Sequence, residues 1–133
     1  MQSRVLLIGG DIAAIVAFGL LGMASHEDGV NATTIGRAIL PFLVAWLVIA
    51  PWTGAFSDRA VVGRFPVAYV LMVWFVAGVA GMCGRALVFD RALFTAFFAI
   101  GITGIGLFLG GWRVIYDWWA TRPTSTEVRT VGR

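Results

Sequence analysis

Hydrophobic residues gather in four long stretches of the chain, and polar residues are concentrated between them. The stretches cover residues 5–24, 38–56, 65–84 and 93–112. Each has about the 20 residues that a helix needs to cross a hydrocarbon core roughly 30 Å thick. A backbone inside lipid must satisfy its own hydrogen bonds, and a helix does so within one segment. The pattern therefore predicts an all-α integral membrane bundle of four transmembrane helices over residues 1–119, with a polar tail over 120–133.

The composition agrees with a membrane protein and gives no support to an enzyme. The chain is 59% hydrophobic and 13% charged, whereas soluble domains carry roughly 25% charged residues. Four spans take up most of the 133 residues and leave no room for a separate soluble catalytic domain. A single cysteine, Cys83, excludes an internal disulfide and a cysteine-based zinc site. No nucleophile, metal-ligand cluster or phosphate-binding loop is evident, so we expect no enzymatic activity, no cofactor and no metal.

The basic residues are ten arginines, and their distribution predicts the orientation in the membrane. With four spans, seven of them fall on the side of the termini: Arg4, Arg59, Arg64, Arg113, Arg122, Arg129 and Arg133. The other three, Arg37, Arg85 and Arg91, fall on the opposite side. The positive-inside rule then places both termini in the cytoplasm of a multi-pass protein in the cell (inner) membrane. Because the arginines are scattered at helix ends, we expect the lipid bilayer as a partner and not a nucleic acid.

One acidic residue, Asp11, lies inside an apolar stretch. It follows the start of the first helix by about six residues, which is roughly 9 Å at 1.5 Å per residue. Charged aspartate near the centre of a span costs on the order of 3 kcal/mol, and such residues usually face a partner, a cavity or a pathway. Arg113 directly follows the fourth apolar stretch, on the same side of the membrane. An Asp11–Arg113 ion pair is one interpretation, and proton or cation handling by Asp11 is the other.

Small residues at helical spacing indicate where helices approach closely. Gly106 and Gly110 have the small-xxx-small spacing of packed membrane helices, and Gly81 belongs to a similar series on the third helix. Such faces are needed both for packing helices within a four-helix bundle and for forming a dimer. They therefore do not distinguish a monomeric bundle from a dimer.

A second group of polar residues is expected at the opposite side of the membrane. His26 follows the first apolar stretch, Arg37 opens the second and Arg85 ends the third. A lone histidine at an interface is most often solvated or capping. The sharper hypothesis is a small external polar cluster of the three residues, which the histidine would allow to titrate near neutral pH.

These landmarks resemble an uncharacterised prokaryotic family of small four-helix membrane proteins, known only as a domain of unknown function. The resemblance rests on residues spread along nearly the whole apolar region: Asp11, Ser25-His26, Pro41-Phe42, Gly81-Met82 with Arg85, and Gly111-Trp112-Arg113. It implies the four-helix architecture and brings no activity with it.

Two classes of function fit the sequence. The first is a non-enzymatic accessory or assembly module that acts through helix packing, on a larger membrane partner or as a homodimer. The second is a small proton-coupled transporter that uses Asp11, most simply as a homodimer. An unpaired Asp11 favours transport, and an Asp11 paired with Arg113 favours the module.

Overall fold

The computed structural model describes residues 2–24, 31–57, 66–90, 92 and 96–121. All regular structure in these residues is helical: α1 (Gln2–Ala24), α2 (Ala32–Ala38), α3 (Leu40–Thr53), α5 (Pro66–Phe89) and α6 (Ala96–Ala120). One residue separates α2 from α3, and together they form a single span. In the described part of the chain, four helices are thus long and apolar enough to cross a membrane. The all-α class and the four spans predicted from the sequence are confirmed.

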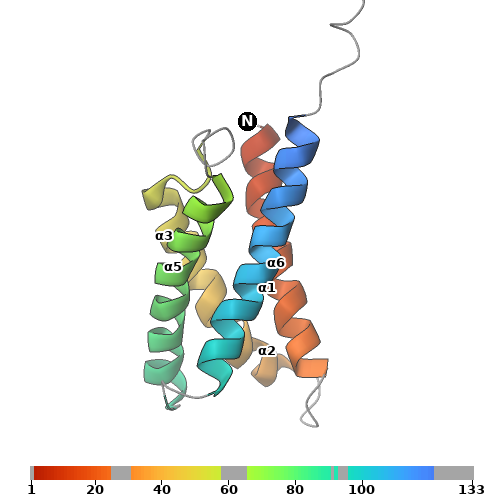
Figure 1. The fold of residues 1–133 in the computed structure, drawn as a ribbon. Helices are drawn as coiled ribbons and strands as arrows, with labels where there is room; N and C mark the ends of the chain where they lie inside the picture. Colours follow the sequence, from red (N-terminus) through yellow and green to blue (C-terminus); the bar gives the residue numbers. More distant parts are fainter. Residues whose placement is uncertain (1, 25–30, 58–65, 91, 93–95, 122–133) are drawn as a thin grey trace, which may run out of the picture.

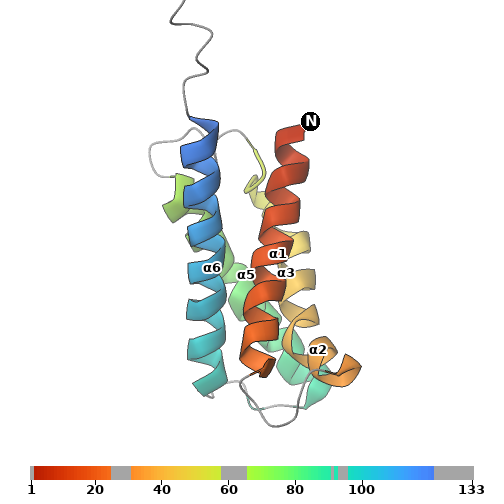
Figure 2. The ribbon, with the colours of Figure 1, turned by 90° about the vertical axis from the view of Figure 1, so that its right-hand side faces the viewer.

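The helices form an upright bundle in which the first and last are neighbours (Figure 1). α1 packs against α6, α3 packs against α5, and α5 joins the two pairs by packing against α6. α1 makes only sparse contact with α3, although the two are consecutive spans. The start of α1 and the end of α6 lie at the same end of the bundle, and α2 lies at the opposite end (Figure 2).

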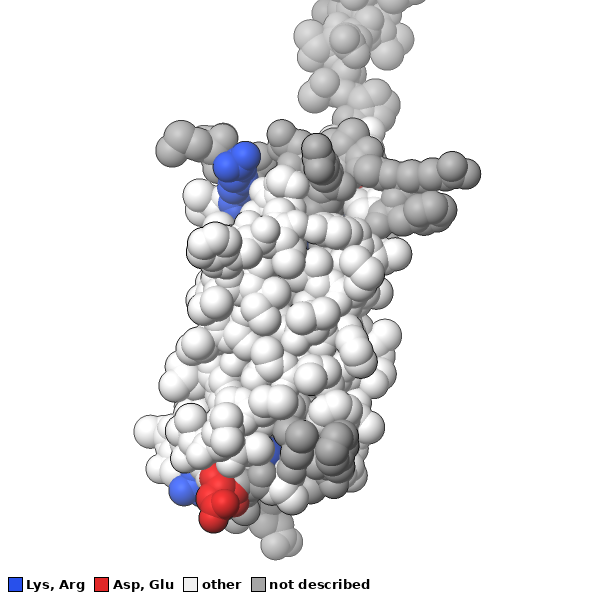
Figure 3. Space-filling view, turned by 90° about the vertical axis from the view of Figure 1, so that its left-hand side faces the viewer, with Lys and Arg blue, Asp and Glu red and all other residues white. Residues whose placement is uncertain are grey.

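The outer surface has the polarity of a membrane protein. In the face shown in Figure 3, coloured charged atoms appear near the two ends, and the wide middle band is white. At the end that carries the N-terminus, exposed indoles project from the last turns of two helices: Trp52 of α3 and Trp118 and Trp119 of α6. Indole rings prefer the boundary between lipid and water. This end of the bundle therefore suits a membrane interface.

The helix bounds differ from the apolar stretches because polar residues also join helices. The second span begins at Ala32, where the Asn31 side chain accepts hydrogen bonds from the amides of Thr33 and Thr34 at 3.0 and 2.9 Å. Such a cap satisfies amides that have no partner in the first turn of a helix. α5 and α6 also run past the ends of the apolar stretches at 84 and 112: α5 continues through Arg85 to Phe89, and α6 continues through Arg113 and Asp117 to Ala120. The apolar pattern locates a membrane span, whereas hydrogen bonding decides where its helix starts and stops.

A column of aromatic rings fills the space between the two helix pairs. The rings of Phe42 and Trp74 are 6.1 Å apart, those of Trp74 and Trp46 6.0 Å, and those of Trp46 and Phe56 6.1 Å. Trp74 of α5 also donates a hydrogen bond from its indole Nε1 to the Ile102 carbonyl of α6, at 2.9 Å. Lipid tails are as apolar as the core, so close packing and hydrogen bonds between helices hold such a bundle together. The column supplies both.

Two adjacent glycines of α1 have opposite surroundings. A β-carbon on Gly10 would overlap the indole of Trp112 on α6, so the close approach of these helices requires a glycine there. A β-carbon on Gly9 would meet nothing within 4 Å. Gly10 is therefore a contact between helices, and Gly9 faces outward.

We expect Gly10→Ala to lower the stability of the bundle and Gly9→Ala to leave it unchanged or raise it slightly. Overpacking of this kind costs about 1–3 kcal/mol, whereas the helix propensity gained on replacing glycine is shared by both variants. Thermal unfolding of the two variants and the wild type in the same detergent measures the difference. Equal stability of the two variants would contradict the close packing of Trp112 on Gly10.

Candidate functional site

The most buried polar residues described in the bundle are Asp11 of α1 and Arg113 of α6, which form an ion pair. Their side chains are 0% and 3% exposed. Arg113 Nε donates to Asp11 Oδ1 at 2.8 Å, and Nη2 donates to Oδ2 at 2.5 Å. This is the two-pronged geometry in which a guanidinium fits a carboxylate best. The two charges cancel locally, which is the condition under which a membrane bundle tolerates them.

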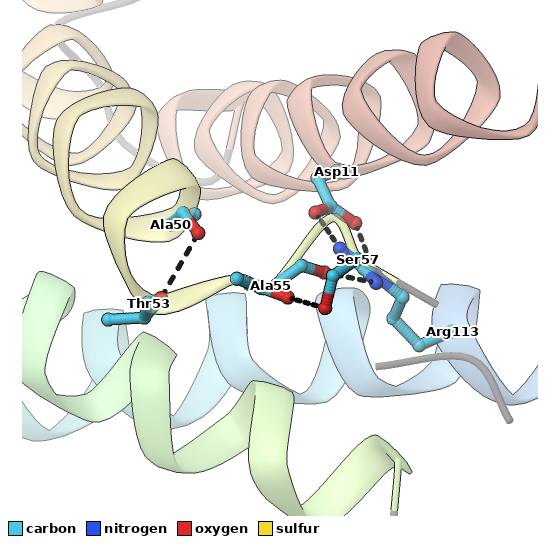
Figure 4. A network of polar contacts seen from close by, with 7 residues as sticks. Asp11, Ala50, Thr53, Ala55, Ser57 and Arg113 are labelled. Carbon is cyan, nitrogen blue, oxygen red and sulfur yellow. Dashed lines mark hydrogen bonds and ion pairs between the residues drawn. The ribbon is translucent and has the colours of Figure 1, made fainter. Parts of the chain in front are cut away.

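The residues after α3 supply a second partner, and a third hydrogen bond, for the guanidinium (Figure 4). Gly54 follows α3 in the left-handed region at φ 77°, a conformation that glycine adopts without strain. The chain reverses there, and the Ala55 amide donates back to the Ala50 carbonyl at 2.9 Å. This turn leaves the Ala55 carbonyl facing Arg113, whose Nη1 donates to it at 3.0 Å. Arg113 thus ties the end of α3 to α1 and α6, across the seam where α1 and α3 barely touch.

Aromatic side chains enclose the pair. The guanidinium carbon of Arg113 lies 5.7 Å from the centre of the Phe56 ring, which gives a cation–π contact at the end of the aromatic column. Trp46 lies beside the Asp11 carboxylate, but its Nε1 makes no hydrogen bond of ordinary geometry with a described residue. The site is therefore apolar on its walls and polar only at its centre.

Comparison with known proteins places the chain in a family. A family model described as protein of unknown function (DUF3054) matches residues 8–116, which is most of the chain. The chain belongs to this family. No curated protein and no solved structure matches it. The region that matches DUF3054 includes both Asp11 and Arg113, so the ion pair lies within the family's domain.

The polar cluster expected at the other end of the bundle is described in part. Arg85 of α5 donates from Nε to the backbone carbonyl of Arg37 in α2, at 3.2 Å. That carbonyl is available because Pro41, four residues later, has no amide hydrogen to offer it. The side chain of Arg37 itself is exposed. His26 lies outside the described residues, so its place in such a cluster stays a prediction.

The three candidate packing glycines lie within the bundle. Gly106 and Gly110 face α5, where added β-carbons would come within 3.1 Å of Trp74 and 3.3 Å of Leu71. Gly81 faces α3, and its β-carbon would lie 3.0 Å from the Phe42 ring. All three are therefore used for contacts inside one chain. Among the described residues, no group of three or more His, Cys, Asp or Glu side chains comes together as a metal site.

The interpretation of Asp11 and Arg113 as an ion pair rested on their positions near the same side of the membrane, and the structure brings the two side chains together. It did not include the Ala55 carbonyl, Phe56 or Trp46. The direction of the carbonyl that follows Gly54 depends on the fold. A backbone atom carries no residue-type signal, so that partner of Arg113 could not be found from the sequence.

We expect Asp11 and Arg113 to depend on each other in a double-mutant cycle. Asp11→Asn or Arg113→Gln alone leaves a buried charge without its counter-charge, a loss of about 3–5 kcal/mol in buried pairs. The double variant removes both charges and should lose clearly less than the two single losses together. Unfolding in detergent measures each term, with Arg4→Gln on the exposed part of α1 as a control that should change little. Additive losses would show that the two side chains act independently.

Proposed function

We propose that this protein is a small accessory or assembly module of the cell membrane, without catalytic activity, that acts by packing its helices against other membrane proteins. The observation that supports this proposal is the state of Asp11. Both of its oxygens accept hydrogen bonds from Arg113, and neither side chain is exposed. An acid that is held in this way stabilises the arrangement of three helices and is poorly suited to exchanging a proton with water.

The alternative is a small proton-coupled transporter, which the depth of Asp11 within α1 favours. Transport would need the carboxylate to part from Arg113 and meet water during each cycle. A single narrow bundle would also need a second copy to enclose a path. Gly81, Gly106 and Gly110 face neighbouring helices of the same chain. These glycines therefore support packing within one bundle, and a dimer would have to form through other surfaces.

The surfaces that remain for a partner are apolar and face the bilayer. On α1, Gly9 and Ala13 are exposed one helical turn apart, and the space beside Gly9 is open. On α6, Gly111 is also exposed with open space beside it. Small residues let the backbone of another helix approach closely in lipid. A homodimer or a larger membrane protein could be held at such positions without rearranging the bundle.

We expect no substrate-driven proton flux from the wild-type protein in proteoliposomes that hold a pH-sensitive dye and receive a panel of cations and lipophilic amines. We also expect co-purification of a larger membrane protein or of a second tagged copy, weakened by Gly9→Leu while stability is kept. Flux that is lost in Asp11→Asn but kept in Asp117→Asn would replace the accessory function by proton-coupled transport. Absence of flux together with a strictly monomeric, partner-free protein in native lipid would contradict the proposal.

For the orientation we propose that both termini are cytoplasmic. This is supported by the arginine asymmetry and by the start of α1 and the end of α6, which lie at the same end of the bundle (Figure 1). In a Cys83→Ala background, Val61→Cys should resist a membrane-impermeant thiol reagent added to intact cells, whereas Val30→Cys should react. Lysed cells serve as the control, because both positions should then be labelled. The reverse pattern in intact cells would mean the opposite orientation.

A further inference from the structure

Trp46 is a fully buried side chain whose indole Nε1 has no hydrogen bond of ordinary geometry with any described residue. The residue is 0% exposed, and no described group accepts a hydrogen bond from its Nε1. Its ring is fixed by edge-to-face contacts with Trp74 and Phe56, at centroid distances of 6.0 and 6.1 Å. A buried N–H group that loses its bond to water and gains no other is costly, so such groups nearly always find a partner.

The neighbouring tryptophan of the column shows the ordinary solution. Trp74 is equally buried, and its Nε1 donates to the Ile102 carbonyl at 2.9 Å. The two indoles lie in contact with each other, in the same apolar column. The two indoles differ in what lies near their N–H groups. The Ile102 carbonyl lies near that of Trp74, and the Asp11 carboxylate lies near Trp46.

The ion pair beside Trp46 keeps unused hydrogen-bonding capacity. Each oxygen of Asp11 accepts one bond from Arg113 and keeps a further lone pair. Arg113 uses three of its five N–H groups, on Asp11 and on the Ala55 carbonyl. Trp46 lies beside the carboxylate, but its N–H is not in hydrogen-bond geometry with it. A donor and an acceptor that are close but misaligned are the setting in which one bridging water is expected.

We propose that Trp46, Asp11 and Arg113 form a binding site for a single internal water molecule within the membrane-spanning bundle. The water accepts from Trp46 Nε1 and donates to a free lone pair of Asp11, whose carboxylate Arg113 holds in place. A buried water of this kind needs two to four polar partners, and Trp46 and Asp11 supply them.

The chemistry of the site selects water over other ligands. A cation would meet the guanidinium of Arg113, and an anion would meet the carboxylate of Asp11. An apolar molecule would leave the indole N–H of Trp46 without a bond. Water is neutral, small, and both donates and accepts. One internal water between Trp46 and Asp11 does not make a proton path, because transport would also need the carboxylate to part from Arg113 during each cycle.

The test uses the wild-type chain, labelled with ¹⁵N at its six indoles, in lipid nanodiscs. Water-selective NMR should show a contact between bulk-derived water and the Trp46 Nε1 proton, and none at Trp74, the matched buried control. Rotating-frame spectra separate a direct contact from proton exchange by the sign of the signal. Deuterium should also replace the Trp46 indole proton faster than that of Trp74.

Trp46→Phe and Trp74→Phe each delete one indole signal and so assign the two resonances. If either variant fails to fold, assignment through the backbone of the wild-type chain replaces it. A Trp46 proton without a water contact, and as slow to exchange as that of Trp74, would overturn the proposal and indicate a direct bond from Trp46 to a protein acceptor.

Discussion

The arrangement of the bundle depends on the need to satisfy one arginine inside a membrane-spanning structure. Arg113 brings a full charge and five donors into a place that is 97% shielded from solvent. Its partners come from two other parts of the chain: the carboxylate of Asp11 on α1 and the carbonyl of Ala55 after α3. α1 and α3 make few contacts with each other. The hydrogen bonds of this guanidinium therefore hold the end of α3 to α1, whereas side-chain packing holds the other helix pairs together.

The rest of the interior is held by shape rather than by charge. The aromatic column runs from Phe42 to Phe56 and ends at the arginine, so packing and ion pairing are continuous. Glycines allow it: Gly106 leaves room for Trp74, and Gly81 leaves room for Phe42. Aromatic rings that pack beside glycines make many close van der Waals contacts. In lipid, such contacts are a main source of the stability of a helix bundle.

Much of this architecture could be predicted from the sequence, because lipid restricts what a chain can do. The spans follow from length and apolarity, and the pairing of Asp11 with Arg113 was one of two interpretations, based on their positions near the same side of the membrane. The start of the second span at Ala32 could not be predicted from apolarity, since a polar cap determines it. The helix that each glycine faces, and the role of the Ala55 carbonyl, depend on the rotation of helices and on one turn at Gly54. Helix rotation and the direction of this turn are set when the bundle assembles, and no residue type or spacing in the sequence indicates them.

The position of the ion pair in the chain has a consequence for biosynthesis. Asp11 and Arg113 are 102 residues apart, in the first and last helices of the bundle. During synthesis the acid enters the bilayer early, and its counter-charge is made only after every other span. Until α6 is inserted, Asp11 of α1 has no counter-charge from Arg113. The partly inserted protein therefore differs from the four-helix bundle in carrying an unpaired carboxylate among its apolar helices.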